Sequence, residues 1–513
     1  MRDAKGEPQA YVMSRDAGVL LGALAVLLHV VANASSPYGW QRDEFLYFAM
    51  GQHLQLFRMD FPPFIAILAR AGRAWFGDSL VATRLFPAFA HAALIVLSAR
   101  TARVLGGGRF AEWLAALAVL MSPLFMRPGT LFQPVVFDQL WWTCALFALL
   151  QVERTQDGHW WMAVGVSLGL GLLTKFSIAF IALPLVIGVV LSPTRRWLST
   201  RWPWIAAGIA CLIGLPSVVG QLQLGFPVLT QMHDLENSQL AYVTPLAFLA
   251  AQVLFSPVFV PLSLWALFAL VRRPASRAVG IACVGAFVLL MALKGKAYYV
   301  GPIYPTLFAA TAVGVEGIAS QRRLVRSLVV AAALVVGVVI APFGYPVVPP
   351  VSMARYAAAV GITSAVKTNQ GEQLELPQDY ADMLGWEEMV RAVAKVYHAL
   401  PRAEQEQAVI VGQNYGRAGA VDFFADRYGL PHSVSTAGSY WFFGPGDRPG
   451  NVVISIGSDR ADLEQYFESV QLVAQTSNPM GVPEERAVPI WVCRSPRNRQ
   501  TLQSLWPSFA GQN

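Results

Sequence analysis

Charged residues are scarce in this sequence. Only 13% of its 513 residues are charged, whereas 55% are hydrophobic, and the charged share is about half that of an average soluble chain. Disordered proteins and coiled coils need far more charge, so both classes are excluded, as is an ordinary water-soluble enzyme. The composition indicates a membrane protein.

Cysteine and histidine are also sparse. Cys144, Cys211 and Cys283 lie within apolar stretches, and Cys493 stands alone near the C-terminal end. This distribution provides no disulfide framework and no Cys-x-x-Cys pair. The seven histidines are scattered and form no HExxH motif, so the sequence does not predict a structural zinc site.

The few charges that are present are unevenly distributed. Residues 1–349 carry 25 Lys/Arg and 14 Asp/Glu, a net charge of +11, whereas residues 350–513 carry 13 and 17, a net charge of −4. The long apolar runs end near Tyr345. We therefore predict a basic transmembrane domain (1–349) followed by a water-soluble domain (350–513). The basic surplus suits an anionic lipid surface and gives no reason to expect nucleic-acid binding.

Apolar segments long enough to cross a bilayer are frequent in the first domain. They occur at about 17–34, 82–104, 110–126, 135–151, 203–222, 245–271, 277–293, 298–318 and 325–345. The stretch 159–191 is too long for one span and is interrupted near Lys175, so we predict two short helices that meet there. This gives about eleven spans and places the two termini on opposite sides of the membrane.

The basic residues predict the orientation of these spans. A cytoplasmic N-terminus puts 16 of the 25 basic residues in inner loops: Arg2, Lys5, Arg15, Arg100, Arg103, Arg109, Arg154, Arg195, Arg196, Arg201, Arg272, Arg273, Arg277, Arg322, Arg323 and Arg326. Nine face outward and need another explanation: Arg42, Arg58, Arg70, Arg73, Arg84, Arg127, Lys175, Lys294 and Lys296. A cleavable signal peptide ending at Ala32-Asn33-Ala34 is the alternative for the first span. The motif directly after it favours a retained helix.

The outer loop at about 35–81 is too long for a mere connection. Residues 45–57 and 63–76 within it read as amphipathic helices of the membrane interface. In the second of them we expect Phe64, Ile65, Leu68 and Trp75 to face lipid, with Arg70 and Arg73 toward water.

The C-terminal part reads as a small α/β domain. Strands are predicted at 408–411 and 451–456, and helices at 385–399, 417–427 and 459–469,. The Gly-rich run 412–419 lacks the spacing of a phosphate-binding loop, so we interpret it as a structural turn between strand and helix.

Four acidic residues on the predicted outer face are candidates for chemistry. Asp43 and Glu44 follow the first span, and either a helix-capping role or a general-base role fits that position. Asp60, in Asp60-Phe61-Pro62-Pro63, reads as a turn and helix start. Asp138, at the outer end of a span, is a helix cap, a second carboxylate beside Asp43, or a partner for Arg42 or Arg127. A divalent cation held by Asp43, Glu44 and Asp138 is left open.

Basic and aromatic residues gather at other points of the same face. Lys294 and Lys296 are followed by Tyr298 and Tyr299, and Lys175 lies at an outward break. The lysines either extend toward water from span ends or bind a lipid phosphate. No charge is expected at the membrane midplane, which argues against an ion-coupled transporter.

Taken together, these motifs resemble the glycosyltransferase family 39 proteins, bacterial members of the GT-C class related to protein O-mannosyltransferases and lipid A aminoarabinose transferases. The matching segments are RDEFLY (42–47), DFPP (60–63), FQPVVFDQLWW (132–142), GLGLLTKFS (169–177) and KGKAYYVGPIYP (294–305). LPQDYADMLGWEEMV (376–390) and NYGRAGAVDFF (414–424) resemble the C-terminal region of one bacterial branch.

This resemblance implies a polytopic helical GT-C fold with a C-terminal α/β domain in the periplasm of a bacterial inner membrane. It implies transfer of a sugar from a polyprenyl-phosphate donor to a glycan, lipid or protein hydroxyl. Asp43, with Glu44 beside it, is then the catalytic base and Asp138 the second acid. Lys294, Lys296 and Lys175 bind the donor phosphate, with Arg42, Tyr298 and Tyr299 nearby. A lipid-linked-sugar flippase and a membrane scaffold are the alternatives.

Overall fold

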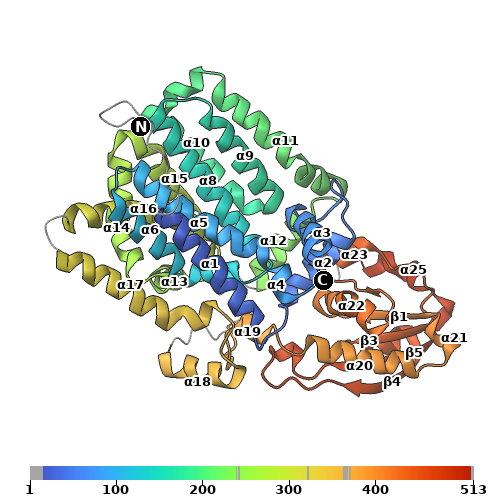
Figure 1. Ribbon diagram of the computed structural model, residues 1–513. Coiled ribbons are helices and arrows are strands. Elements are labelled where there is room, and N and C mark those ends of the chain that lie inside the picture. The colour runs from blue at the N-terminus through green and yellow to red at the C-terminus, as the bar shows by residue number, and fades with distance from the viewer. Residues whose placement is uncertain are drawn as a thin grey trace.

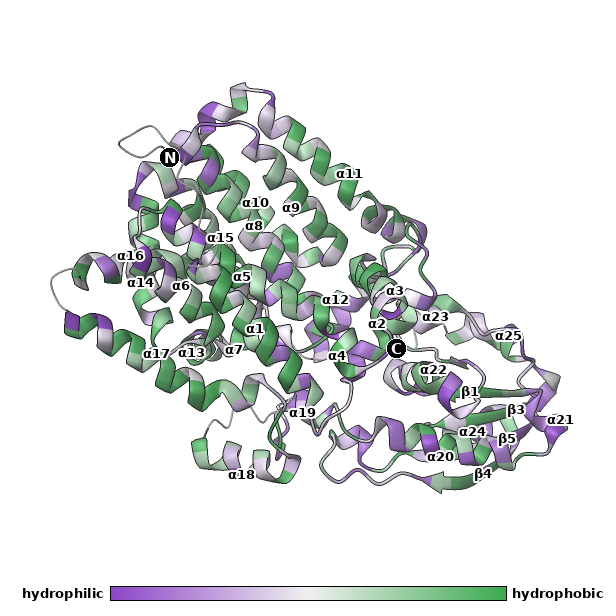
Figure 2. Ribbon diagram, viewed as in Figure 1, coloured by the Kyte–Doolittle hydropathy of each residue, from purple (hydrophilic) through white to green (hydrophobic). Residues whose placement is uncertain are grey.

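The computed structural model describes residues 16–238, 240, 243–319, 323–361, 368 and 371–509, without the side chains of residues 319 and 499. It contains a large helical bundle and a smaller α/β domain at one end of it (Figure 1). Apolar residues dominate the bundle, whereas polar and apolar residues are mixed in the small domain (Figure 2). The predicted fold class, a helical membrane protein with a C-terminal α/β domain, is confirmed. The expected positions of Arg2, Lys5, Arg15 and Arg322 fall outside the described residues.

Six helical segments in the described part of the chain are long and apolar enough to cross a membrane. They are α1 (Ala17–Ala34), α5 (Leu85–Val104), α8 (Pro134–Thr155), α11 (Trp202–Gln223), the segment Pro274–Ala292 that contains α15 (Arg277–Ala292), and α17 (Arg323–Gly344). Each matches a span predicted from the apolar runs.

The predicted number of eleven spans is not confirmed, because several apolar runs are bent or short. Helices α6 (Arg109–Leu120) and α7 (Pro123–Gly129) meet at 60°, and α13 (Pro245–Phe255) and α14 (Phe259–Arg272) meet at 102°. The segment Phe176–Val190, which contains α10 (Ala179–Val190), is bent by 95° against η3 (Pro193–Ser199). Counting each bent pair as one span gives at most nine among the described residues. Proline and serine at the bends interrupt the helical hydrogen bonds, which an apolar run does not reveal.

The predicted break at Lys175 is present. Helix α9 (Trp160–Thr174) ends there, and Lys175 has an extended backbone, with φ −162° and ψ 138°. A 3-10 turn, η2 (Phe176–Ile178), then leads into α10. The span predicted at 298–318 is likewise not a single α-helix. It begins with another 3-10 segment, η6 (Ala297–Ile303), which leads into α16 (Tyr304–Ala319).

Acidic residues at the predicted inner ends of the helices are paired. Asp16 caps α1 and forms an ion pair with Arg100. Glu112 pairs with Arg103 at 2.5 Å, and Glu316 accepts a hydrogen bond of 2.6 Å from the backbone N–H of Gly108. These contacts hold the ends of α1, α5, α6 and α16 together, which accounts for acids beside apolar segments.

The outer loop folds into α2 (Arg42–Gln52), α3 (Phe64–Phe76) and α4 (Leu80–Thr83). Both predicted helices are present, but they do not simply lie in lipid. Helix α2 is packed between α3 and the C-terminal domain. In α3, Ile65 is fully buried and Phe64 packs against Phe137 and Trp141, so the expectation that Ile65 faces lipid is wrong. Trp75 is 71% exposed.

The C-terminal domain is built on a five-stranded sheet of order β2-β1-β3-β5-β4. Strands β2 (Ser433–Val434), β1 (Ala408–Gly412) and β3 (Val452–Ile456) are parallel, and β5 (Pro489–Pro496) and β4 (Phe467–Gln475) are antiparallel to their neighbours. The predicted helices correspond to α20 (Trp386–Ala399), α22 (Tyr415–Tyr428) and the shorter α24 (Arg460–Tyr466). Residues 467–469, predicted as helix, begin strand β4, because pairing with β5 overrides the local pattern.

Short elements connect the two parts. Helix α18 (Pro350–Val360) begins at the predicted domain boundary, and α19 (Gln378–Ala381) precedes α20. Tyr380 of α19 is buried, and its hydroxyl donates a 2.7 Å hydrogen bond to the carbonyl of Pro342 in α17. The linker is thereby attached to the bundle.

Candidate active site

The start of α2 separates the roles of two neighbouring acids. Gln41 is the N-cap residue: its side chain accepts a hydrogen bond from the N–H of Asp43 at 2.9 Å, and its own N–H donates to Glu44 at 2.7 Å. This reciprocal arrangement satisfies the exposed N–H groups of the first turn. The expected capping role of Asp43 is therefore wrong, because Gln41 and Glu44 perform it.

Glu44 is fully buried and saturated with hydrogen bonds. The guanidinium of Arg84 donates to both carboxylate oxygens, at 2.6 and 2.9 Å, and the N–H of Phe132 donates at 2.8 Å. Arg84 is itself fully buried and also donates to Asn33 at 3.0 Å. Both oxygens of Glu44 thus accept hydrogen bonds, and the buried ion pair links the start of α2 to Arg84,. It also explains why Arg84 departs from the positive-inside pattern.

Asp43 lies in a different environment. It is half-buried, and one carboxylate oxygen, Oδ1, accepts a 2.8 Å hydrogen bond from the hydroxyl of Tyr415 in the C-terminal domain. No other hydrogen bond to this carboxylate occurs within the described part of the chain. Asp43 therefore has an oxygen available to accept a proton, whereas Glu44 does not.

Asp138 lies one turn inside α8 and is buried. Its two oxygens accept hydrogen bonds from Trp142 at 3.0 Å and from Ser177 at 2.8 Å. The helix cap is Gln133, so the capping interpretation of Asp138 is wrong. The pairing with Arg42 or Arg127 is wrong as well, because those arginines bind acids of the C-terminal domain. Asp138 instead holds the turn that follows Lys175 and interacts electrostatically with that lysine.

Three of the predicted phosphate-binding residues lie together above this turn. The ammonium of Lys175 is 4.3 Å from the ring centre of Tyr299 and 5.9 Å from that of Tyr298. The two tyrosine rings contact each other edge to face, with centres 4.7 Å apart. Aromatic faces stabilise an ammonium without neutralising it, so the charge of Lys175 stays available to an anion.

Lys296 joins the same group of charges. Burial lowers the pKa of its ammonium, and the positive charge of Lys175 lowers it further. Tyr299, Asp43 and Asp379 act in the opposite direction and raise the pKa. An anion between Lys175 and Lys296 would relieve the repulsion between them. Asp43 and the two lysines thus belong to one electrostatic neighbourhood.

Two predicted phosphate-binding residues have other surroundings. The side chain of Lys294 is exposed at the turn after α15. Arg42 points to the C-terminal domain, where it pairs with Glu484 at 2.8 Å and with Asp382 at 3.5 Å. Arg42 therefore links the outer loop to the C-terminal domain.

The three acids suggested as metal ligands do not meet. Glu44 is bound to Arg84 and Asp138 to Ser177 and Trp142, and only Asp43 has free capacity. Within the described ranges, no group of three His, Cys, Asp or Glu residues is placed to hold a metal ion.

Asp60 also binds the C-terminal domain. Its carboxylate accepts a 2.7 Å hydrogen bond from the hydroxyl of Ser439, and burial raises its pKa. Its backbone carbonyl accepts a hydrogen bond of 2.5 Å from Gln221 in α11. Asp60 thus connects the outer loop with α11 and with the C-terminal domain.

Sequence reasoning missed several residues of this region. Tyr47 lies four residues after Asp43, on the same face of α2, and interacts electrostatically with Asp43, Tyr415 and Tyr299. The four-residue spacing was a usable signal for Tyr47. Tyr415 carries no such signal, because it is 372 residues away from its partner.

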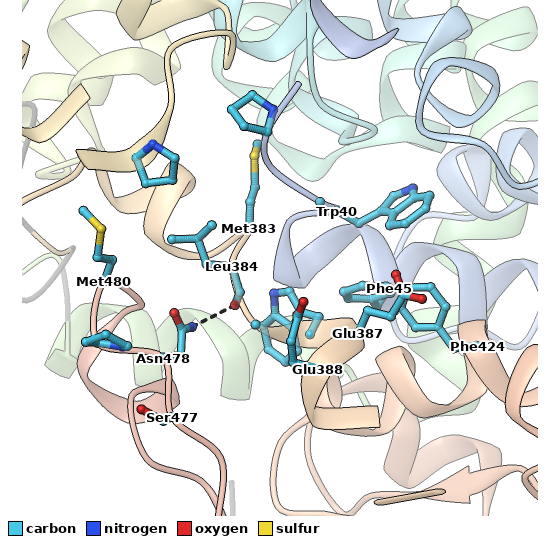
Figure 3. Close-up of a pocket in the computed structure, with 16 residues that line it drawn as sticks. Trp40, Phe45, Met383, Leu384, Glu387, Glu388, Phe424, Ser477, Asn478 and Met480 are labelled. Atoms are coloured by element: carbon cyan, nitrogen blue, oxygen red, sulfur yellow. Dashed lines mark hydrogen bonds between the residues drawn. The ribbon is translucent and has the colours of Figure 1, made fainter. Parts of the chain in front are cut away.

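A cavity of about 440 Å³ lies beside the site, at the seam between the outer loop and the C-terminal domain (Figure 3). Trp40, Phe45 and Phe424 form one side, and Met383, Met480 and Asn478 form another. The side chain of Asn478 donates to the carbonyl of Leu384 at 2.9 Å. None of the predicted catalytic or phosphate-binding residues lines this cavity.

Comparison with known proteins finds similarity to membrane glycosyltransferases. The sequence profile of the dolichyl-phosphate-mannose-protein mannosyltransferases matches residues 60–219. The chain is 25% identical over 265 residues to the lipid A galacturonosyltransferase RgtD of Rhizobium johnstonii, an alignment that covers 51% of this chain and 56% of that protein. The chain therefore spans about half the length of this curated relative.

Solved structures extend the likeness to nearly the whole chain. The apo structure of ArnT from Cupriavidus metallidurans has a TM-score of 0.60 at 16% identity, covering 92% of this chain and 97% of that one. ArnT bound to undecaprenyl phosphate gives 0.57 at the same identity and coverage. The fold is that of the GT-C glycosyltransferases. The oligosaccharyltransferase of Archaeoglobus fulgidus is a more distant GT-C neighbour, with a TM-score of 0.51 at 12% identity and coverage of 83% of this chain and 65% of that one.

The GT-C fold expected from the sequence motifs is confirmed. Because the identities are low, these structures establish the fold and not the reaction. The profile match begins at Asp60 and ends within α11. It therefore includes Asp138 and Lys175 but not Asp43, Lys294 or Lys296.

Proposed function

We propose that this GT-C protein transfers a sugar from a polyprenyl-phosphate donor to a hydroxyl group on the periplasmic face of a bacterial inner membrane. The proposal rests on the electrostatic interactions of Lys296 with Asp43 and Lys175, and on the position of the Lys175 ammonium, 4.3 Å from the ring centre of Tyr299. The known relatives support it, since one is a galacturonosyltransferase and another was solved with undecaprenyl phosphate.

The proposed roles follow from the charge changes of the reaction. Breaking the bond between the anomeric carbon and the phosphate oxygen leaves its electron pair on the phosphate, where Lys296 and Lys175 stabilise the added negative charge. The acceptor oxygen forms the new bond to the anomeric carbon, and the Asp43 carboxylate takes its proton. Asp138 holds Ser177 and thereby the turn that carries Lys175. The sugar, hexose or pentose, and the acceptor stay open.

Asp43→Asn tests the base. The amide keeps the size of the side chain but cannot take the proton, so we expect turnover to fall by about two to four orders of magnitude. Binding of undecaprenyl phosphate should be unchanged. The assay follows radiolabelled sugars linked to undecaprenyl phosphate, with galacturonic acid and arabinose among the sugars tested. Full activity of the variant would rule out Asp43 as the base.

Lys296→Ala tests the phosphate site. Losing one charge-assisted contact should weaken binding of undecaprenyl phosphate by about 10- to 150-fold, the equivalent of roughly 1.5–3 kcal/mol. Lys294→Ala is the matched control, because its side chain is exposed only two residues away. Equal losses in both variants would indicate a diffuse attraction between charges. Movement of the labelled donor across the membrane without bond cleavage would instead favour a flippase.

A further inference from the structure

One turn of the C-terminal domain contacts the acid that we propose as the base. The Gly-rich run 412–419 forms the end of β1 and the start of α22, and Asn414 caps the helix by accepting a 2.9 Å hydrogen bond from the N–H of Arg417. The interpretation of this run as a structural turn is therefore correct. The first two residues of α22 are Tyr415 and Gly416, and both face the outer loop.

Two glycines bring α22 unusually close to α2. A Cβ atom at Gly416 would lie 2.5 Å from Cγ of Arg42, and one at Gly419 would lie 2.8 Å from Cβ of Phe45. Both distances are shorter than a non-bonded carbon contact. The close packing fixes Tyr415 relative to Asp43 although the two residues belong to different domains.

The contact itself is a hydrogen bond between a phenol and a carboxylate. The Tyr415 hydroxyl donates to Oδ1 of Asp43 at 2.8 Å. Burial raises the pKa of Tyr415 well above that of a free tyrosine, and the negative charge of Asp43 raises it further. The hydroxyl therefore stays a donor throughout the working pH range. A hydrogen bond of this kind favours the ionised form of the carboxylate.

We propose that Tyr415 is a positioning residue of the active site, and that the C-terminal domain thereby completes it. The hydroxyl holds Oδ1 of Asp43 and leaves Oδ2 directed to the acceptor. Without it the carboxylate rotates among a broad range of χ2 angles. This inference rests on the proposed function, because it assigns Tyr415 to the base of that reaction.

The other polar groups around Asp43 come from several elements. Arg42 and Tyr47 lie on α2, Lys296 precedes η6, and Asp382 follows α19; each interacts electrostatically with Asp43. All of these remain when the Tyr415 hydroxyl is removed. A change in the pH–rate profile of Tyr415→Phe therefore reports on the hydroxyl.

The test compares Tyr415→Phe with Tyr440→Phe. Tyr440 is buried in the same domain and donates a hydrogen bond of equal length, 2.8 Å, to Asp422, which takes no part in the site. For Tyr415→Phe we expect kcat to fall on the order of 10-fold, with KM for the donor within about twofold. The acid limb of the pH–rate profile should move to higher pH. Tyr440→Phe should leave kcat, KM and the profile at wild-type values.

A double variant separates positioning from general damage. In an Asp43→Asn background, Tyr415→Phe should cause no further loss, because the base that it orients is already gone. Wild-type kcat in Tyr415→Phe, equal losses in both tyrosine variants, or additive losses in the double variant would each overturn the inference. Those outcomes leave the proposed function intact if Asp43→Asn is inactive. If wild-type protein transfers no label from any undecaprenyl-phosphate sugar in the panel, both proposals fail.

Discussion

Two adjacent acids, Asp43 and Glu44, have opposite surroundings. Successive positions on a helix point about 100° apart, so one can face the protein interior while the other faces the membrane surface. Glu44 is enclosed by Arg84 and two backbone N–H groups. Asp43 accepts a side-chain hydrogen bond at only one oxygen, from Tyr415. The two environments bury Glu44 in an ion pair and leave an oxygen of Asp43 free of side-chain hydrogen bonds from the described residues.

Glu44→Gln should therefore damage the fold more than the chemistry. The substitution leaves the buried Arg84 guanidinium without its counter-charge, and breaking a buried pair costs about 3–5 kcal/mol. We expect lower yield and a lower thermal midpoint in detergent, whereas Asp43→Asn should change stability by less than about 1 kcal/mol. Wild-type stability with no turnover in Glu44→Gln would transfer the role of base to Glu44.

Helices α2 and α22 form a close contact between the outer loop and the C-terminal domain. Their approach depends on Gly416 and Gly419, and the aromatic side chains of Phe45, Trp40 and Phe423 pack around it. Such a contact is specific because its shape leaves no room for a larger residue.

Gly419→Ala should disturb this contact. The added methyl group would overlap the backbone and Cβ of Phe45, and overpacking of this kind typically costs 1–3 kcal/mol. We expect a lower thermal midpoint and slower sugar transfer. Gly208→Ala is the control, because no atom of the described residues, apart from the neighbouring backbone of α11, lies within 4 Å of the position that a Cβ at Gly208 would take. Similar behaviour of the two variants in thermal unfolding would show that the contact between α2 and α22 tolerates expansion.

The stability contributed by Asp382, which follows α19 and contacts Arg42, should depend on pH. Burial raises the pKa of Asp382 to about 7, although Arg42 opposes the shift. Since this value is above the 3.8 of a free carboxyl, the folded protein binds the proton more tightly than the unfolded chain. The stabilising contribution is complete below about pH 4 and is lost as the pH rises through about 7.

Thermal unfolding in detergent at pH 5 and pH 8 measures this effect. The wild-type midpoint should fall more between the two values than that of Asp382→Asn, which carries no titrating group at this position. Equal falls in the two proteins would show that Asp382 does not titrate differently in the folded state.

Basic residues that the sequence predicts to face outward attach the C-terminal domain to the rest of the chain. Arg127 of α7 pairs with Asp379 at 2.9 Å and lies 4.3 Å from the ring centre of Tyr380. Arg42 pairs with Asp382 and Glu484. These contacts explain two departures from the positive-inside pattern. They also hold the C-terminal domain against the outer loop, as expected if both lie on one face of the membrane.

Cysteine labelling tests that topology. Glu468→Cys in β4 should react with a membrane-impermeant maleimide in cells with a permeabilised outer membrane. Asp157→Cys, between α8 and α9, should react only after lysis. Both positions are exposed, and Cys211→Ser removes the exposed native cysteine. The reverse pattern would place the site in the cytoplasm and contradict the orientation predicted from the arginines.

The sequence alone determined the class of the molecule. Long apolar runs, the distribution of basic residues and the ordered motifs from Arg42 to Pro305 sufficed for a GT-C bundle, its C-terminal domain and the break at Lys175. These features are local, because hydropathy and backbone preference act over a few turns of chain. The same locality explains the wrong span number, since bends such as that between α13 and α14 depend on packing.

Only the tertiary structure decided how the individual acids are used. Asp43 and Glu44 are neighbours in sequence, and their difference arises from Arg84, forty residues away, and from Tyr415 in the other domain. Ser177 and Asp138 likewise meet only when α8 packs beside the turn after α9. Hydrogen bonds between distant segments form when the chain compacts, and no local pattern specifies their partners. The sequence thus supplies the charged groups, and packing selects which of them remain free to react.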